Sequence, residues 1–333
     1  MASKKYLIAG LGSIGRRHLK NLESLGERDI SFYRTHKGTI SGDEFKDYPV
    51  FTDLKIALNS QPDAVIISNP TFLHMQVATP AAEAGCALLI EKPLAHQLDD
   101  LMAFEGVIKR NKNLVLTAYQ FRFNPGLIKV KELLDDNSVG RPISFQGTWG
   151  EYLPGWHPWE DYRSSYAANS EMGGGVVLTL SHPLDYLIWL FGGVKDLFAN
   201  TGKKSSLELQ CEDHADVILN FKTGFTGALH LDYYCQPKRH DLTVQCSDGV
   251  ISWDYATSNV VVEMNDGEMI IHTTPEGFER NDMFMAEMQH FIDCMDGKAT
   301  SICDYEDGKK ALKLATGILQ SGRYRERVIF DSF

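Results

Sequence analysis

The chain has 333 residues, 43% hydrophobic and 23% charged, a composition typical of globular proteins with one or two domains. Its formal net charge of −11 argues against a general affinity for nucleic acid or for anionic membranes. No apolar run reaches the roughly 20 residues of a membrane span, and the six cysteines lack metal-site spacing. We therefore expect a cytoplasmic protein with reduced thiols and no bound metal.

The first 120 residues alternate short apolar runs with amphipathic segments. The runs predict strands over 6–9, 29–34, 50–51, 64–68, 87–90 and 114–118. Helices are expected between them, ending near 25 and covering about 53–59, 74–84 and 97–111. Pro80 lies inside the third of these helices and predicts a kink or a restart there. Strands that alternate with helices indicate βαβ units around a parallel sheet.

A glycine-rich loop, G-x-G-x-x-G, directly follows the first strand and opens the first helix. Gly10 permits the tight turn, Gly12 lets the backbone approach a pyrophosphate, and Gly15 allows close packing of helix and strand. Ser13 and Ile14 lie at the helix N-terminus, where free N–H groups can bind phosphates. The loop therefore predicts a dinucleotide-binding Rossmann domain.

The end of the second predicted strand distinguishes the two nicotinamide dinucleotides. An NAD-binding protein usually has an acidic residue there, bonded to the ribose 2′-hydroxyl. This chain has Arg34 and Thr35 instead, with Lys37 nearby, and a guanidinium can bind a 2′-phosphate with two hydrogen bonds. NADP(H) is therefore favoured, while NAD(H) stays possible.

Two further motifs follow predicted strands, at the sheet edge where ligands bind in open α/β folds. Asn69 and Pro70, with His74, follow the fourth strand. Lys92 follows the fifth strand, so its ammonium is expected in the cofactor crevice. There it can bind a substrate hydroxyl and stabilise a developing alkoxide.

These motifs together resemble the glucose–fructose oxidoreductase / inositol dehydrogenase (Gfo/Idh/MocA) family. The resemblance rests on GLGSIG (10–15), SNPTFLH (68–74), EKP (91–93) and YQFRFNP (119–125). It implies an NAD(P)-binding domain over 1–122 and a substrate-binding and oligomerisation domain over 123–333. It also implies that Lys92 contacts nicotinamide and substrate, that the Lys92–Pro93 peptide can be cis, and that Glu91 and Gln120 lie at the cofactor. A homodimer or homotetramer is expected on the same basis.

From about residue 143 the pattern changes to short segments with period-two alternation. A strand is expected over 143–150 and a helix over 182–191. Further strands are expected over 215–221, 227–233, 242–247, 250–254 and 260–264, and closing helices over about 282–295 and 305–320. The second domain is therefore predicted to be α+β, with a large, open, mostly antiparallel sheet.

His182 follows the glycine cluster 173–175 and is the candidate general acid/base, because imidazole titrates near neutral pH. In the family, an acidic residue stands three or four places before this histidine. Here those positions hold Thr179 and Leu178, so the family's Lys–Asp–His arrangement is incomplete. Thr179 can bind a substrate or a water, and Asp185 is a candidate substrate contact or a residue that orients His182.

An aromatic stretch over 150–163 is interpreted as a substrate loop, since rings stack on the apolar faces of sugars. Tyr152, Trp156 and Arg163 are candidate contacts there, together with Arg122. This stretch resembles family members of bacterial surface-sugar and sialic-acid-like biosynthesis.

The sequence thus predicts an oxidoreductase that moves hydride to or from a sugar, a nucleotide-linked sugar or a cyclitol. Lys92 polarises the substrate oxygen and His182 moves the hydroxyl proton. Two alternatives stay open. The dinucleotide is held tightly and recycled, or the protein is a catalytically impaired dinucleotide-binding sensor or scaffold.

Overall fold

The apolar runs of the first 120 residues form a six-stranded sheet in the computed structural model, which describes residues 4–35, 45–331 and 333. All neighbouring strands are parallel, and their order is β3-β2-β1-β4-β5-β6, the order of a dinucleotide-binding fold. The strands are β1 (Lys5–Ala9), β2 (Asp29–Tyr33), β3 (Val50–Phe51), β4 (Ala64–Ile67), β5 (Ala87–Glu91) and β6 (Val115–Ala118). The predicted Rossmann fold is confirmed.

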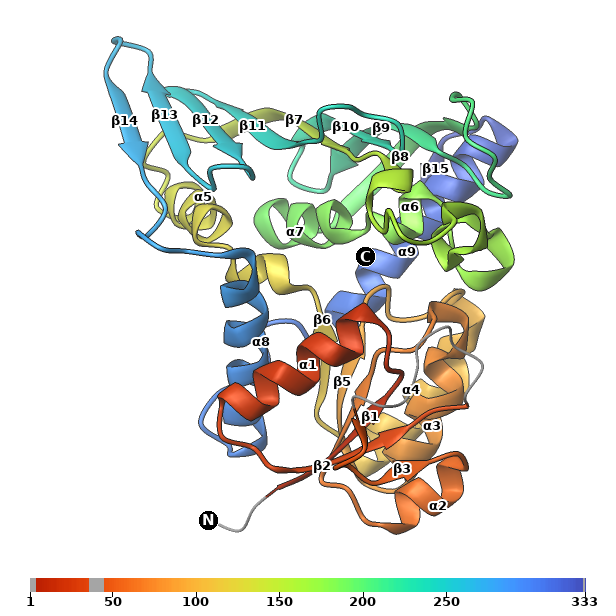
Figure 1. Ribbon diagram of the computed structural model, residues 1–333. Helices are drawn as coiled ribbons and strands as arrows, with labels where there is room; N and C mark the ends of the chain where they lie inside the picture. Colours follow the sequence, from red (N-terminus) through yellow and green to blue (C-terminus); the bar gives the residue numbers. More distant parts are fainter. Residues whose placement is uncertain (1–3, 36–44, 332) are drawn as a thin grey trace. The chain divides into compact units, whose positions relative to one another are not determined.

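Helices cover both faces of this sheet (Figure 1). Helices α3 (His74–Glu83) and α4 (Leu101–Asn111) pack together on one face, and α1 (Ser13–Ser24) and α8 (Arg280–Met295) pack together on the other. A short helix, α2 (Leu54–Asn59), begins at the capping side chain of Asp53 and lies beside β2 and β3. The expected restart at Pro80 is wrong, because α3 continues through it as one helix.

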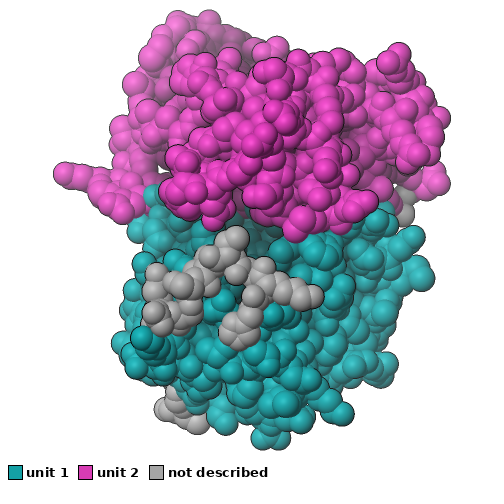
Figure 2. All heavy atoms as spheres, turned by 45° about the vertical axis from the view of Figure 1, so that its right-hand side comes forward, with its two compact units in different colours: residues 1–120, 280–309 teal, residues 121–279, 310–333 magenta. Residues whose placement is uncertain are grey.

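The chain divides into two compact units (Figure 2). Unit 1 contains residues up to Gln120 together with Arg280–Lys309, and unit 2 contains Phe121–Glu279 and Lys310–Phe333. This differs from the division at residue 122, which placed 280–309 in the second domain. The reason is packing: Met288, Phe291 and Ile292 of α8 are buried in the same apolar cluster as Leu19 and Leu22 of α1.

Unit 2 is built on a nine-stranded sheet in the described part of the chain, with order β14-β13-β12-β11-β7-β10-β9-β8-β15. Only β7 and β10 pair in parallel, so the predicted mostly antiparallel sheet is confirmed. Its strands are β7 (Pro142–Gly150), β8 (Val194–Gly202), β9 (His214–Phe221), β10 (Thr226–Asp232), β11 (Arg239–Cys246), β12 (Gly249–Asp254), β13 (Val260–Met264), β14 (Met269–His272) and β15 (Val328–Ile329).

One face of this second sheet is buried and the other is largely exposed. In β9, Val217 and Leu219 are buried while Asp216 and Ile218 between them are exposed, the alternation of a half-buried strand. The helices of this unit are α5 (Pro125–Asp135), α6 (Val176–Thr179), α7 (His182–Phe191) and the larger part of α9 (Tyr305–Tyr324). Sequence analysis missed β8, β14 and β15.

In the described part of the chain, no single helix is long and apolar enough to cross a membrane. One bent pair, Ser170–Thr179 with His182–Phe191, reaches the required length and composition when the two are taken together.

Candidate active site

The glycine loop of unit 1 is shaped as the sequence predicted. Gly10 has a φ of +101°, and a Cβ there would lie 2.6 Å from the Asn69 nitrogen. A Cβ at Gly15 would lie 2.1 Å from the Gly10 carbonyl oxygen, so α1 can approach the loop only with glycine at that position. Gly12 faces open space instead. The loop is thus tightly packed against the protein at Gly10 and Gly15, and it leaves space for a ligand at Gly12.

The first turn of α1 presents its N–H groups without a side-chain cap. Gly12 is the N-cap residue and makes no side-chain hydrogen bond, and no acidic residue stands in the first turn. Gly12 and Ser13 are exposed. Uncapped N–H groups and the positive end of the helix dipole suit a pyrophosphate, so the residues present fit a dinucleotide.

Arg34 and Thr35 lie directly beside the glycine loop. The Gly10 N–H donates to the Tyr33 carbonyl (3.2 Å), and the Arg34 N–H donates to the Phe51 carbonyl (3.0 Å). Arg34 is half-buried and Thr35 is exposed. The predicted assisting residue Lys37 lies outside the described residues.

His74 connects the segments that follow β4 and β5. Its Nε2 lies 3.0 Å from the Asn69 carbonyl oxygen, and its Nδ1 lies 3.4 Å from that of Leu94. Burial lowers the pKa of His74 below its usual value, against the opposing effect of the carbonyl oxygens that its ring nitrogens face. His74 is 1% exposed, and its contact with the Asn69 carbonyl connects it to the segment that follows β4, where the sequence predicts cofactor binding.

A buried pair that sequence analysis missed lies beneath Lys92. His18 of α1 is fully buried, and its Nε2 donates to Glu91 Oε1 (2.8 Å). The other carboxylate oxygen of Glu91 accepts a hydrogen bond from the Lys92 N–H (3.3 Å), and the Lys92–Pro93 peptide bond is cis. The helix that carries the glycine loop is thereby tied to the turn that carries Lys92, which itself is half-buried.

In unit 2, His182 begins α7 and packs within a cluster of aromatic rings. Its ring lies 5.6 Å from Trp149 in a stacked arrangement and 4.8 Å from Phe121. His240 stacks on the other side of the cluster, 4.2 Å from Trp149, and burial lowers its pKa to about 3. His182 is 3% exposed, so the cluster fixes the orientation of its ring.

Arg122 and Asp185 form a buried ion pair with two hydrogen bonds, Nε to Oδ2 (3.0 Å) and Nη2 to Oδ1 (2.6 Å). Asp185 lies one turn after His182 on α7, and Trp189 of the same helix lies beneath the guanidinium. Because both side chains are almost fully buried, the pair joins the segment around residue 122 to α7. The predicted substrate contact at Arg122 is therefore better placed to hold α7, and with it His182.

A carboxyl group lies near the glycine cluster 173–175, although positions 178 and 179 hold no acidic residue. Glu212 Oε1 accepts a hydrogen bond from the Val177 N–H (3.2 Å), beside Gly175 at the start of α6. Burial raises the pKa of Glu212 to about 7. Thr179 ends α6 and is 3% exposed. Glu212 stands in no recognisable motif, so sequence offered no signal for it.

Glu212→Gln is expected to stabilise unit 2 more at pH 8 than at pH 5, by about 1 to 2 kcal/mol. Between pH 4.5 and about 7 the unfolded state has lost the Glu212 proton while the folded state keeps it, so stability of the wild type falls as pH rises. Glutamine removes this titration and retains the acceptor for Val177. Urea unfolding of both proteins at each pH measures the difference; an equal difference at both pH values contradicts the raised pKa.

The candidate substrate contacts in the aromatic loop differ in their exposure and in the contacts that they already make. Tyr152 is 39% exposed, and Trp156 packs edge-on against Tyr233 at 5.7 Å. Arg163 is already paired with Asp161 (2.8 Å) and with Glu208 (3.4 Å) on the surface. Tyr152 and Arg163 are thus both accessible, but Arg163 binds a substrate only by exchanging these partners.

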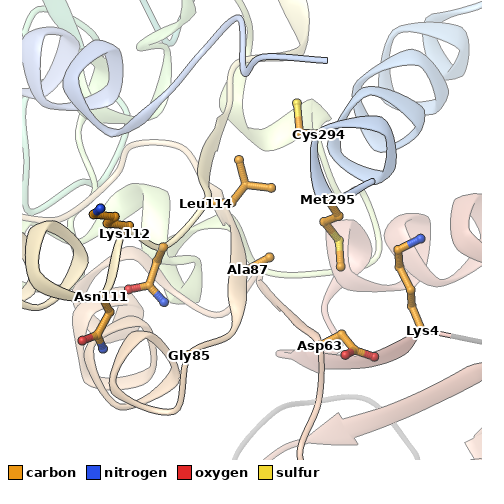
Figure 3. A pocket seen from close by; sticks show the side chains of 10 residues that line it. Lys4, Asp63, Gly85, Ala87, Asn111, Lys112, Leu114, Cys294 and Met295 are labelled. Atoms are coloured by element: carbon orange, nitrogen blue, oxygen red, sulfur yellow. The ribbon is translucent and has the colours of Figure 1, made fainter. Parts of the chain in front are cut away.

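A pocket in unit 1 lies away from these motifs (Figure 3). It is lined by residues at the amino ends of strands, among them Lys4, Asp63 and Ala87, with Met295 of α8. Ligands of open α/β sheets bind at the carboxyl ends of the strands, so this pocket is not the dinucleotide site.

Comparison with known protein families agrees with this geometry. A model described as an oxidoreductase family with an NAD-binding Rossmann fold matches residues 4–119, and a GFO/IDH/MocA C-terminal domain model matches residues 127–252. The chain belongs to the Gfo/Idh/MocA family. The family resemblance predicted from the four motifs is therefore confirmed.

Three proteins similar to this chain share a minor part of its sequence. The scyllo-inositol 2-dehydrogenase (NAD(+)) of Bacillus subtilis is 24% identical over 96% of this chain and 93% of its own. An uncharacterized oxidoreductase of Synechocystis is 32% identical over 147 residues, so this chain spans only 39% of that relative's length. Levoglucosan dehydrogenase in complex with NADH superposes with a TM-score of 0.87 at 17% identity, covering 99% of this chain and 100% of that one. The last likeness shows the fold.

Proposed function

We propose that this protein is a nicotinamide-dependent dehydrogenase or reductase that acts on a CH–OH group of a sugar or cyclitol. The observation that carries the proposal is in unit 1, where the His18–Glu91 pair ties the glycine-loop helix to the Lys92 turn. A dinucleotide-binding loop and a cation suited to an alkoxide are thus held at one sheet edge. Relatives named for scyllo-inositol and levoglucosan support the substrate class.

In the proposed reaction, Lys92 and His182 are the reacting side chains. The Lys92 ammonium donates a hydrogen bond to the substrate oxygen and stabilises the negative charge that develops there. His182 takes the hydroxyl proton during oxidation and returns it during reduction. The bound dinucleotide supplies the carbon that accepts or gives hydride. Glu91 and His74 position the cofactor-side segments, and Arg122 with Asp185 positions α7.

The test is turnover by purified protein on a panel of inositols, aldoses, anhydrosugars and nucleotide-linked sugars, with either dinucleotide, followed by absorbance of the reduced nicotinamide. We expect at least one substrate, with His182→Asn lowering kcat by about 10²-fold or more and leaving dinucleotide binding unchanged. A protein that binds dinucleotide but turns over no compound in either direction supports the alternative, an impaired sensor or scaffold.

We further propose that Arg34 selects NADP(H). Arg34 follows β2 directly beside the glycine loop, at the position where an NAD-binding protein usually has an acidic residue, and its guanidinium can bind a 2′-phosphate with two hydrogen bonds. Arg34→Asp is expected to weaken NADPH binding about 10- to 100-fold and to strengthen NADH binding, because a carboxylate repels the phosphate and accepts from the ribose hydroxyl. Fluorescence titration measures both affinities. Arg28→Asp, the same charge change at an exposed position before β2, is the control. Equal or tighter binding of NADH by the wild type contradicts the proposal.

A further inference from the structure

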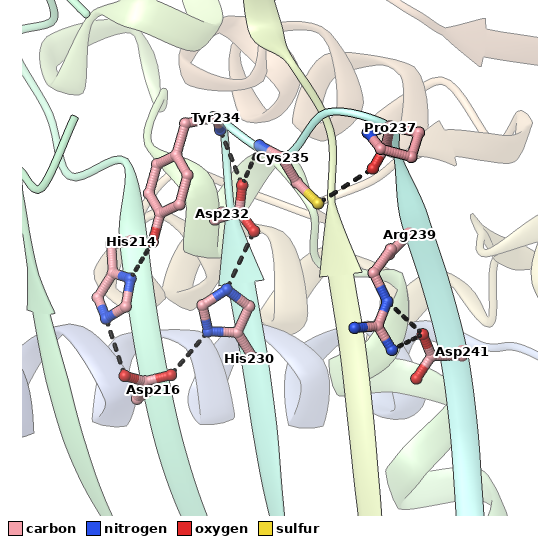
Figure 4. Close-up of polar contacts among 9 residues, drawn as sticks. All are labelled: His214, Asp216, His230, Asp232, Tyr234, Cys235, Pro237, Arg239 and Asp241. Carbon is pink, nitrogen blue, oxygen red and sulfur yellow. Dashed lines mark hydrogen bonds and ion pairs between the residues drawn. The ribbon is translucent and has the colours of Figure 1, made fainter. Parts of the chain in front are cut away.

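A group of four alternating His and Asp side chains lies on the exposed face of the unit 2 sheet (Figure 4). His214 and Asp216 lie two residues apart on β9, and His230 and Asp232 lie two apart on β10. In the antiparallel register Asp216 is opposite His230, and His214 is opposite Asp232. All four side chains therefore project from the same face, next to one another.

The potential ligand atoms of this group converge on Asp216. Its Oδ2 lies 2.9 Å from His214 Nε2, and its Oδ1 lies 2.7 Å from His230 Nδ1. One ligand atom from each of the three residues lies within 4.8 Å of the others. Two ligands of one metal ion, each about 2.1 Å from it, are about 3.0 to 3.4 Å apart. An ion thus needs a rearrangement of these side chains by about 1 Å, in which the two close pairs separate and the more distant ligand atoms approach.

We propose that His214 Nε2, a carboxylate oxygen of Asp216 and His230 Nδ1 bind one divalent transition-metal ion, with zinc the expected species. Two imidazoles and one carboxylate are ligands that zinc accepts, and three protein ligands leave a position for water or for another group. The Asp216 side chain is 57% exposed and that of His230 is 32% exposed, so an ion can enter from solvent.

The surroundings of the two imidazoles support this proposal independently. His214 Nδ1 lies 2.7 Å from the Tyr234 hydroxyl, and His230 Nε2 donates to Asp232 Oδ2 (3.0 Å). Each ring is thus fixed through the nitrogen that faces away from Asp216, which leaves the other nitrogen to the ion. Metal-binding histidines usually have such an outer partner, and a carboxylate is a common one.

Asp232 is itself held firmly, as an outer partner must be. Its side chain is 3% exposed, and Oδ1 accepts hydrogen bonds from the N–H groups of Tyr234 (2.8 Å) and Cys235 (2.6 Å). An ion at this group would connect β9 to β10 on the face opposite the buried Val217 and Leu219. The proposal adds a metal site to the protein and does not depend on the dehydrogenase function.

The experiment is zinc titration of the chelator-treated full chain against a chromogenic zinc indicator, with elemental analysis after gel filtration. We expect one zinc per chain, and a Kd raised at least about tenfold by Asp216→Asn and by His230→Gln. Tyr234→Phe, which removes only the outer partner of His214, is expected to weaken binding less. Asp241→Asn is the matched control, because Asp241 lies on β11 of the same sheet, separated from β10 by β7, and pairs with Arg239 instead.

Cobalt provides a second measurement, since its visible spectrum reports nitrogen and oxygen ligands at low coordination number. The same variants must lose that spectrum while their far-ultraviolet circular dichroism and urea-unfolding curve stay those of the metal-free wild type, which shows that they remain folded. Absence of stoichiometric zinc, or zinc binding that Asp216→Asn and His230→Gln weaken no more than Asp241→Asn, overturns the proposal.

Discussion

Lys92→Ala is expected to lower kcat by about 10²- to 10⁴-fold while the Kd of the dinucleotide changes less than about threefold. The reason is that the ammonium acts on charge that develops only in the transition state, whereas the glycine loop and the α1 N-terminus hold the phosphates. Steady-state kinetics on the first substrate found, combined with fluorescence titration of the dinucleotide, separate the two effects.

Two further variants serve as a control and as a graded comparison for Lys92→Ala. Lys55→Ala on α2 removes an exposed lysine from the same unit and is expected to change neither quantity. Glu91→Gln keeps an acceptor for the Lys92 N–H but weakens the bond to His18, so it should lower kcat less than Lys92→Ala. Loss of dinucleotide binding with turnover retained in Lys92→Ala contradicts the role assigned to this lysine.

Asp185→Ala is expected to destabilise unit 2 by about 3 to 5 kcal/mol, because it leaves the buried Arg122 guanidinium without its carboxylate. The side chains of this pair are 3% and 1% exposed, so water cannot replace the lost partner. Urea unfolding gives the change in free energy. Arg122→Met should cost a similar amount, and the double variant Arg122→Met with Asp185→Leu should recover much of the loss, since no buried charge is left.

The exposed pair Arg163–Asp161 provides the matched control for this experiment. It has the same chemistry and a similar Nη2–Oδ distance of 2.8 Å, but its side chains are 53% and 49% exposed. Asp161→Ala should therefore cost less than about 1 kcal/mol. Equal costs for Asp161→Ala and Asp185→Ala would show that burial does not determine the strength of the Arg122–Asp185 interaction.

The parts of the site that sequence predicted well are those set by local geometry. The positions of Gly10, Gly12 and Gly15 depend on one turn, and Lys92 lies where its strand ends, so chain order alone places them. The strand order of the first sheet follows from the βαβ connections in the same way. These features can be predicted without knowing which distant segments of the chain contact one another.

The parts that sequence missed depend on contacts between distant segments. His18 and Glu91 are 73 residues apart, and Glu212 reaches Val177 across 35 residues, so neither contact has a local signal. Helix α8 has an ordinary amphipathic pattern that does not say which sheet it covers. The strand β14 was missed because Met269, Ile270 and Ile271 are all exposed, which removes the alternation that marks a half-buried strand.

The packing of α8 also determines when the nucleotide-binding fold becomes complete during synthesis. Domains usually fold in order from the N-terminus as the ribosome releases them. Here the apolar face formed by Tyr6, Ile8 and Leu22 receives Met288 and Phe291 only after Arg280–Met295 has been synthesised. Until then this surface is open to water and to other nascent chains. A fragment ending at Gln120 therefore carries every nucleotide-binding motif yet lacks the helix that closes its own core.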